Sequence, residues 1–269
     1  MTRLADVALR AESTPCIRVR AKHAHCLTAV GFDTPLLALP VEGHKRVKDQ
    51  QHSIWVVPGE MFLVTQPTSV DVENFPDEST GRYVALGIPL EAHVLEAARQ
   101  LVKSPMAGNS KRIASVPLEP YIEDFNAWLN ALVRQELSLA CHAVVGIVLK
   151  LYAAGYSNLL YAPAASLSAR IRDMVAREPD REWTSAQLES GFGLSGATLR
   201  RHLAQEGVSL RELIANARLS SALTLLLTTD LPVKTVAARV GYTSMSTFAK
   251  RFRERYGTEP SRIGGIGHV

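Results

Sequence analysis

Basic side chains gather at two places in the last third of the sequence, where their chemistry would suit DNA. They are Arg200, Arg201, Lys250, Arg251 and Arg253. An arginine can donate two parallel hydrogen bonds to O6 and N7 of a guanine, and both arginine and lysine bind backbone phosphate. Residues 164–269 hold 15 Lys and Arg against 10 Asp and Glu, whereas residues 1–163 hold 15 against 16. The positive excess therefore lies in the C-terminal part, where either a solvated basic face or a surface for nucleic acid would explain it.

The second basic group falls within residues 233–255, which have the pattern of a helix-turn-helix. Such a unit needs a short first helix, a tight turn and a second helix with one buried and one outward face. The expected first helix and turn contain Val236, Ala237, Val240, Gly241 and Tyr242. Phe248 and Phe252, four residues apart, would anchor the second helix inward. The residues left to face outward are Met245, Ser246, Ala249 and Lys250, and those suited to phosphate are Arg251, Arg253 and Arg255.

Residues 184–204 repeat this plan around the first basic group. The inward residues are Leu188, Leu199 and Leu203, and Gly193-Leu194 makes the turn. The outward residues are Gly196, Ala197, Arg200 and Arg201. One such unit could be two packed core helices, but two units 48 residues apart (Ala197 to Met245), joined by a helix over residues 209–227, favour a DNA-binding domain.

The same stretch resembles the AraC/XylS family of transcriptional regulators. The residues that carry the likeness are Arg218-Leu219, Ala222-Leu223, Leu225-Leu226, Val236-Ala237, Val240-Gly241-Tyr242, Ser244, Phe248, Phe252-Arg253, Tyr256-Gly257 and Pro260-Ser261, within residues 167–262. The resemblance implies an activator whose recognition helices enter successive major grooves of double-stranded DNA, with RNA polymerase as a further candidate partner. It places the base-contacting positions on Ala197, Arg200, Arg201, Met245, Ser246 and Lys250, and implies that Arg218 holds the linker helix in place.

Two residues depart from the family pattern, and both lie in the first unit. Glu189 stands where a small Ala is usual, and Gly196 stands where a helix-starting residue such as Pro is common. A carboxylate at a helix crossing must reach solvent or a partner. Ala197 is also too short to read much beyond a thymine methyl. The first unit is therefore expected to be the less specific reader.

The N-terminal part has the pattern of a small antiparallel barrel followed by helices. Strands are expected at residues 36–41, 54–57, 61–64, 70–73 and 83–88, helices at 90–102, 121–134 and 136–152, and a loop at 104–117. The segments Leu37, Gly43-His44-Lys45-Arg46-Val47, Val57-Pro58-Gly59-Glu60-Met61-Phe62-Leu63-Val64 and Tyr83-Val84-Ala85-Leu86 are similar to the sensor domain of one branch of the same family. This implies a cupin-like barrel for a small-molecule effector and helices that pair two subunits. The predicted class is α+β, with a sensor and dimerisation domain at 1–160 and an all-α DNA-binding domain at 165–269.

A metal-dependent cupin enzyme is the alternative. His23-Ala24-His25 could supply two ligands, but a nearby Glu and a later glycine-flanked His cannot be placed, and His44 and His52 lie in a polar stretch expected at the surface. No nucleophile, P-loop or dinucleotide motif is found, so no catalytic residue, cofactor or metal is expected.

The three scattered cysteines fit a reducing cytoplasm, and the sequence contains no run of about 18 apolar residues that would predict a membrane span. A protein–protein adaptor that keeps the helix-turn-helix fold is a third reading, which the basic balance opposes.

Overall fold

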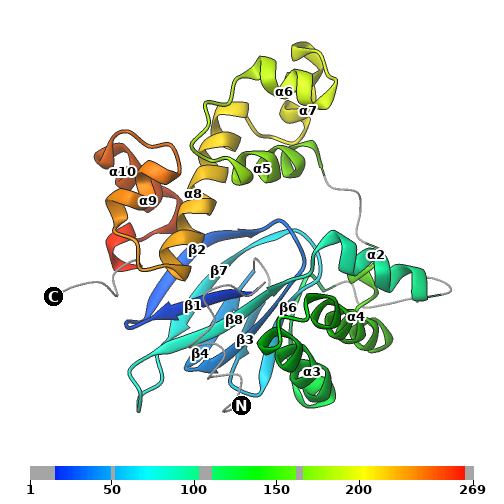
Figure 1. Ribbon diagram of the computed structural model, residues 1–269. Helices are drawn as coiled ribbons and strands as arrows, with labels where there is room; N and C mark the ends of the chain where they lie inside the picture. The colour runs from blue at the N-terminus through cyan, green and yellow to red at the C-terminus, as the bar shows by residue number, and fades with distance from the viewer. Residues whose placement is uncertain (1–15, 50–51, 103–110, 162–165, 264–269) are drawn as a thin grey trace. The chain divides into compact units, whose positions relative to one another are not determined.

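The computed structural model describes residues 16–49, 52–102, 111–161 and 166–263. The chain forms two compact units, Met1–Ala162 and Pro163–Val269 (Figure 1). The first is built on β-sheets and the second is helical. The α+β class predicted from the sequence is therefore confirmed.

The N-terminal unit contains two antiparallel sheets. The five-stranded sheet has the order β1-β8-β3-β6-β9, and the four-stranded sheet has the order β2-β7-β4-β5. The strands of the first are β1 (Ile17–Ala21), β8 (Tyr83–Pro89), β3 (Leu36–Glu42), β6 (Glu60–Val64) and β9 (Ile113–Pro117). Those of the second are β2 (His25–Phe32), β7 (Thr68–Phe75), β4 (His44–Lys48) and β5 (Ser53–Val56).

Side chains on opposite faces of the five-stranded sheet fill two different cores. Successive residues of a strand point to opposite faces. In β3, Leu37 and Leu39 belong to one core and Ala38 to the other; in β6, Met61 and Phe62 divide in the same way. The first core lies between this sheet and helices, and the second lies between the two sheets. The five-stranded sheet is therefore the middle layer of the unit.

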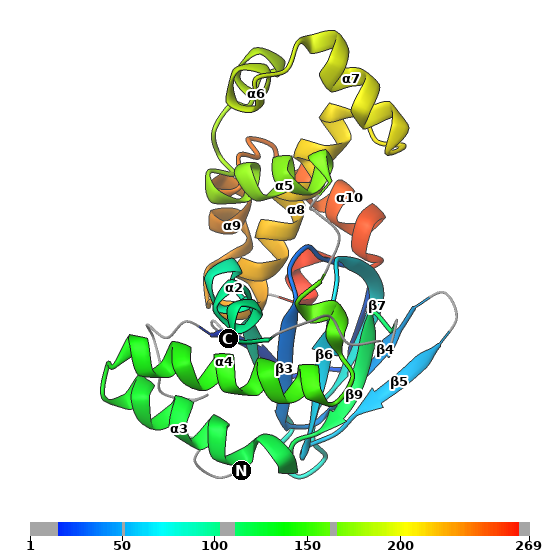
Figure 2. The same ribbon diagram turned by 90° about the vertical axis from the view of Figure 1, so that its right-hand side faces the viewer.

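Three helices cover the outer face of that sheet: α2 (Ala92–Leu101), α3 (Ile122–Val133) and α4 (Leu137–Ala153). Short 3-10 helices occupy Glu119–Tyr121 and Ser157–Leu159. Figure 2 shows α3 and α4 side by side, and their buried residues join the sheet in one core. Trp128, the largest fully buried side chain, meets Phe125 edge-on with ring centroids 6.5 Å apart.

Two expectations for this unit were wrong. Residues 113–117, expected in a loop, form β9, because Ile113, Ala114 and Val116 are buried against β6. Nearby glycine, proline and basic residues concealed this short strand. The polar stretch from His44 forms β4, and His44 is half-buried, with its ring stacked 5.0 Å from that of Phe75.

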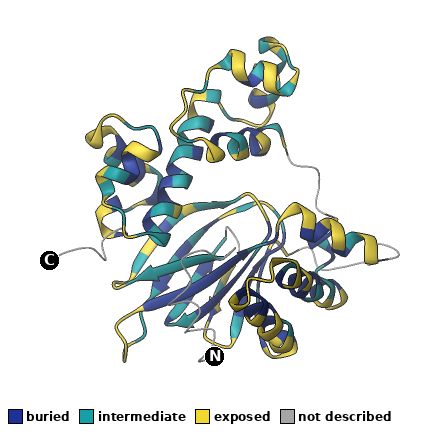
Figure 3. Ribbon diagram, in the orientation of Figure 1, coloured by how far each residue is buried: buried dark blue, intermediate teal, exposed yellow. Residues whose placement is uncertain are grey.

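The C-terminal unit consists of six helices over its described residues. They are α5 (Leu167–Arg177), α6 (Ser185–Phe192), α7 (Gly196–Gln205), α8 (Leu210–Thr228), α9 (Val233–Arg239) and α10 (Met245–Tyr256), with a 3-10 helix at Pro260–Arg262. Figure 3 shows buried and exposed residues mixed along these helices, as amphipathic helices require. None of the helices in the described parts of the chain is long and apolar enough to cross a membrane.

Candidate nucleic-acid interface

The first recognition helix, α7, is positioned by a cap and two buried leucines. The hydroxyl of Ser195 accepts a hydrogen bond from the Thr198 N–H at 3.2 Å, which fixes where the helix begins. Leu199 and Leu203 are buried in the core that α7 shares with α5, α6 and α8. The opposite face carries the predicted outward residues Ala197, Arg200 and Arg201, which are exposed.

The second recognition helix, α10, is positioned in the same way but with aromatic anchors. The Ser244 hydroxyl accepts a hydrogen bond from the Thr247 N–H at 3.3 Å, which caps the start of the helix. Phe248 and Phe252 are fully buried, and their ring centroids lie 5.7 Å apart. The predicted reading residues Met245, Ser246 and Lys250 are exposed.

The turns of the two units differ by one residue. Gly193 (φ 63°) and Gly241 (φ 80°) both adopt the left-handed conformation that favours glycine. The Leu194 N–H donates to the Glu189 carbonyl, and the Tyr242 N–H donates to the Ala237 carbonyl, so equivalent turn residues are 48 positions apart. The N-caps Ser195 and Ser244 are 49 apart, because Thr243 is an additional residue in the second turn.

This extra residue changes which positions of the two recognition helices correspond. The spacing of 48, which paired Ala197 with Met245, was wrong for these helices. In the structure the buried anchors Leu199 and Phe248 are equivalent. The equivalent outward pairs are therefore Ala197 with Ser246, Arg200 with Ala249, and Arg201 with Lys250. Each helix presents one long basic side chain at the same place.

The two unusual residues of the first unit, Glu189 and Gly196, explain each other. The Glu189 carboxylate accepts a hydrogen bond from the Ser185 hydroxyl at 2.6 Å. A Cβ at position 196 would lie only 2.6 Å from Glu189 Oε1. Glycine at the start of α7 therefore makes room for a carboxylate at the helix crossing, and that carboxylate has the partner it requires.

Arg218 of α8 joins three segments of the unit. Its guanidinium donates to the carbonyl oxygens of Pro179 and Arg181 at 2.8 and 2.9 Å. A Cβ at Gly241 would lie 3.0 Å from Arg218 Cζ and 3.0 Å from the Pro179 oxygen. The linker helix, the loop before α6 and the turn of the second unit thus meet at Arg218, in agreement with its predicted structural role.

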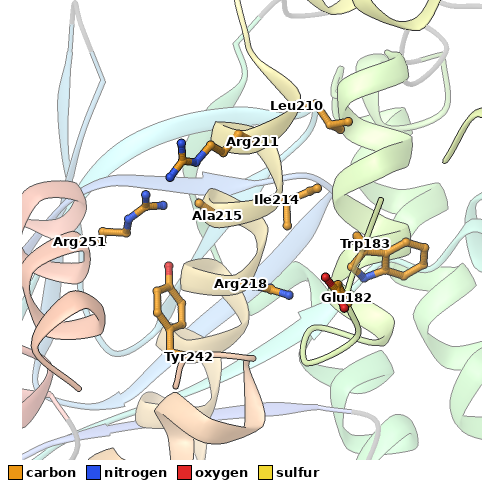
Figure 4. A pocket seen from close by; sticks show the side chains of 9 residues that line it. All are labelled: Glu182, Trp183, Leu210, Arg211, Ile214, Ala215, Arg218, Tyr242 and Arg251. Atoms are coloured by element: carbon orange, nitrogen blue, oxygen red, sulfur yellow. The ribbon is translucent and has the colours of Figure 1, made fainter. Parts of the chain in front are cut away.

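The basic residues beyond the reading positions have different surroundings. Arg253 is exposed and forms an ion pair with Glu259 at 2.8 Å, and Lys250 lies 4.0 Å from Glu254. Arg251 is half-buried and lines a cleft of about 490 Å³ (Figure 4) with Tyr242 and residues of α8. One of these is Arg211, which sequence reasoning missed; its spacing of seven from Arg218 on one helix face was the available signal.

Of the two histidines considered as metal ligands, His25 already has hydrogen-bond partners for both ring nitrogens. His25 Nδ1 donates to the His23 carbonyl and Nε2 accepts from Asn74 Nδ2, both at 3.1 Å. Burial lowers the pKa of His25, which favours this neutral form. No group of three or more His, Cys, Asp or Glu that could hold a metal occurs among the described residues.

Comparisons with known proteins agree with this geometry. A family described as a helix-turn-helix domain matches residues 188–264. An HTH-type transcriptional regulator of Mycobacterium tuberculosis is 37% identical over 101 residues, which are 38% of this chain and 29% of that protein. The transcriptional activator FapR of Escherichia coli is 30% identical over 106 residues, 39% of this chain and 41% of that protein. The chain thus matches less than half the length of these relatives.

Solved structures of ToxT from Vibrio cholerae match over nearly the whole chain. An apo variant has a TM-score of 0.68 at 17% identity, covering 94% of this chain and 97% of ToxT. ToxT with a bound unsaturated fatty acid has a TM-score of 0.65 at 16% identity, with the same coverage. This likeness establishes a shared fold. The sequence matches, taken separately, support a helix-turn-helix domain within the C-terminal unit.

Proposed function

We propose that the chain is a sequence-specific DNA-binding transcription regulator that works as an activator in the cytoplasm. The observation that carries the proposal is the pair of capped recognition helices, each with buried anchors on one face and a long basic residue at the equivalent outward position. A major groove admits one such helix. The name of FapR as an activator supports activation, which implies contact with RNA polymerase.

Arg200, Arg201 and Lys250 are the residues proposed to read bases. All three side chains are exposed, and a bidentate pair with a base edge discriminates by about 1–3 kcal/mol. Ala197 and Ser246, at the equivalent position of the two helices, can make an apolar contact and a hydrogen bond, respectively. Arg253, already paired with Glu259, is proposed to contact phosphate.

The test compares specific with random DNA. An operator is selected from a random duplex pool with the full chain, and affinities are measured by fluorescence anisotropy across a range of salt. We expect Arg200→Ala and Lys250→Ala to weaken binding to the operator by about 5- to 100-fold and to random DNA much less. Arg177→Ala, on the exposed side of α5, is the control. Equal losses on both DNAs would assign these residues to phosphate only, and absence of salt-dependent DNA binding would favour an adaptor instead.

We further propose that a small organic acid binds between the two sheets and regulates the protein. Lys45 of β4 is buried, makes no hydrogen bond or ion pair with the described residues, and places its ammonium over the Phe62 ring, 5.3 Å from the centroid. Burial lowers its pKa to about 8. Asn74 is directly opposite Lys45 in the sheet, and the side-chain oxygen of Asn74 is buried without a hydrogen-bond partner in the described residues. A carboxylate would satisfy a buried cation that lacks an anion.

The acid proposal is tested with oleate, because ToxT has been solved with an unsaturated fatty acid. We expect oleate to bind the full chain at pH 7, and Lys45→Met to weaken binding about tenfold or more. Lys48→Met, three residues along the same strand on the outward face, should leave binding unchanged. The methyl ester of oleic acid should bind poorly. Equal binding of acid and ester, or equal losses in both variants, would contradict the assignment of Lys45.

We propose that α3 and α4 pair two copies of the chain. A groove of about 330 Å³ between them is lined by residues of both helices, including Arg134 and Leu139. Val133, Leu137 and Leu139 are large apolar side chains with 72%, 64% and 56% of their surface exposed. Sedimentation analysis should show a dimer that Leu139→Glu dissociates, whereas Leu101→Glu on α2 should leave it intact. A monomeric wild-type chain at micromolar concentration would contradict this proposal.

A further inference from the structure

The cleft beside α10 carries more positive charge than its own neighbours neutralise. It lies in the C-terminal unit, between α8, α10 and the loop before α6. Arg211 and Arg218 line it from α8, Arg251 lines it from α10, and Glu182 is the one carboxylate in its lining. Figure 4 shows the guanidinium groups of Arg211 and Arg251 extending into the cleft from the two helices.

The three arginines differ in how many hydrogen-bond partners they already have. Arg218 is held by the carbonyl oxygens of Pro179 and Arg181. Arg211 is exposed and makes no hydrogen bond or ion pair with any residue that the structure describes. Arg251 lies beside the shielded hydroxyl of Tyr242, whose pKa is raised because the effect of burial exceeds the opposing effect of the adjacent Arg251. The phenol therefore stays protonated, and the cleft offers at least one guanidinium without a partner among the described residues.

The position of the cleft relates it to the reading face of α10. Arg251 directly follows Lys250, and one residue turns an α-helix by about 100°. Arg251 thus lies on the flank of α10, between the outward residues and the linker helix. At the equivalent position of the first recognition helix the sequence has His202, so the first unit has no counterpart of Arg251.

We propose that Arg211 and Arg251 together bind one DNA backbone phosphate at the edge of the major groove that α10 enters. The proposal rests on the proposed function in DNA binding. Arginine forks match phosphate oxygens with two parallel hydrogen bonds, and phosphate contacts fix the register of a protein on the duplex. The linker helix would then take part in DNA binding and would secure the second recognition helix more firmly than the first.

The first test measures affinity and salt dependence for Arg211→Gln in the full chain. We expect binding to operator and to random DNA to fall by a similar factor of about tenfold, and the salt slope to decrease by about one. Arg211→Lys should keep the slope and recover part of the affinity, because the charge remains and the fork is lost. Arg177→Gln removes the same charge from α5 and should change neither quantity.

The second test locates the phosphate. Operators are prepared in which one phosphate at a time is replaced by a neutral methylphosphonate. We expect one such position to weaken the wild type by about tenfold and to have little effect on Arg211→Gln, since the partner of that phosphate is then already absent. If the wild type binds DNA but no position shows this coupling, or if Arg211→Gln behaves like Arg177→Gln, the cleft does not hold a phosphate of the DNA. If the wild type binds no DNA, the proposed function itself fails.

The third arm separates DNA from a free anion. Inorganic phosphate and pyrophosphate are titrated into the protein without DNA. We expect these free anions to bind weakly, with dissociation constants above about 1 mM, because the proposed site is completed by the DNA duplex. Tight binding that Arg211→Gln abolishes, together with unchanged DNA affinity, would overturn the proposal in favour of a small-anion site.

Discussion

The two helix-turn-helix units share a plan but differ in how each recognition helix is fixed. The first relies on leucines and accommodates a carboxylate, Glu189, at its helix crossing. In the second, the ring centroid of Phe248 lies 5.3 Å from that of Tyr242 and 5.7 Å from that of Phe252, and the turn glycine Gly241 lies next to Arg218. The second turn is one residue longer than the first. Corresponding outward positions of the two recognition helices must therefore be assigned from their buried anchors and not from a constant sequence spacing.

The largest expected effect is the loss of stability when the buried anchor of either recognition helix is truncated. Phe248→Ala should lower the free energy of unfolding by about 3–5 kcal/mol, through the cavity that it leaves and the aromatic contacts that it removes. Leu199→Ala, at the equivalent place in α7, should cost about 2–5 kcal/mol, toward the lower end because no ring contacts are lost. Chemical denaturation of both variants measures the difference. A greater loss from Leu199→Ala would contradict the view that the second unit is the more firmly packed.

An intermediate effect separates the turns. Gly193→Ala should cost about 1–2 kcal/mol, the penalty of left-handed backbone alone, because no atom lies within 4 Å of the added methyl group. Gly241→Ala adds a contact of 3.0 Å with both Arg218 and the Pro179 oxygen, so we expect about 1–3 kcal/mol more. Thermal unfolding of the two variants reports the contrast. Equal decreases in Tm would show that Arg218 and its neighbours move away from the added methyl group without loss of stability.

The smallest effect tests whether Glu189 and Gly196 belong together. Gly196→Ala should displace the Glu189 carboxylate from its hydrogen bond with Ser185 and cost about 1 kcal/mol. In a Glu189→Ala background the same change should be neutral or slightly stabilising, because alanine favours helix over glycine. A double-mutant cycle gives the coupling energy. Additive effects would mean that the two residues are independent.

Titration of Lys45 extends the comparison to the N-terminal unit. Its pKa falls from 10.5 to about 8 on folding, so the unfolded chain binds more protons between these values. The stability of the wild type should therefore rise from about pH 8 toward pH 10.5, and the contribution of Lys45 to stability is lost as the pH falls through 8. Comparing wild type with Lys45→Met over this range isolates the effect. A rise of the same size in the variant would assign it to other groups.

Patterns of apolar residues predicted most of the C-terminal unit. The caps Thr184, Ser195 and Ser244 can be read from the sequence, because a hydroxyl before an amphipathic run has a local role. The extra residue Thr243 was missed, since the register of a helix depends on the turn geometry rather than on composition. The match between Glu189 and Gly196 was also hidden, because only the crossing of α6 and α7 brings residue 196 next to the Glu189 carboxylate.

The N-terminal unit was predicted less completely. Strands with continuous apolar runs, such as β6 and β8, could be predicted from the sequence, whereas β4 was not predicted because most of its residues are basic. Those charges are explained by a partner strand far along the chain: Arg46 and Lys48 both pair with Glu73 of β7. The burial of Lys45 on the opposite face of the same strand also depends on tertiary packing, and the expectation of a surface stretch at this point was therefore wrong.

The contacts of Arg218 have a consequence for the DNA rather than for the protein. Arg218 hydrogen-bonds the linker helix to the loop before α6 and lies next to the turn glycine before α10, so this packing restrains movement of the two recognition helices relative to each other. Each base pair inserted between two half-sites moves the second by about 3.4 Å and turns it by about 35°. If the chain acts as the proposed regulator, we expect its DNA sites to conserve the number of base pairs between half-sites more strictly than the bases in that interval.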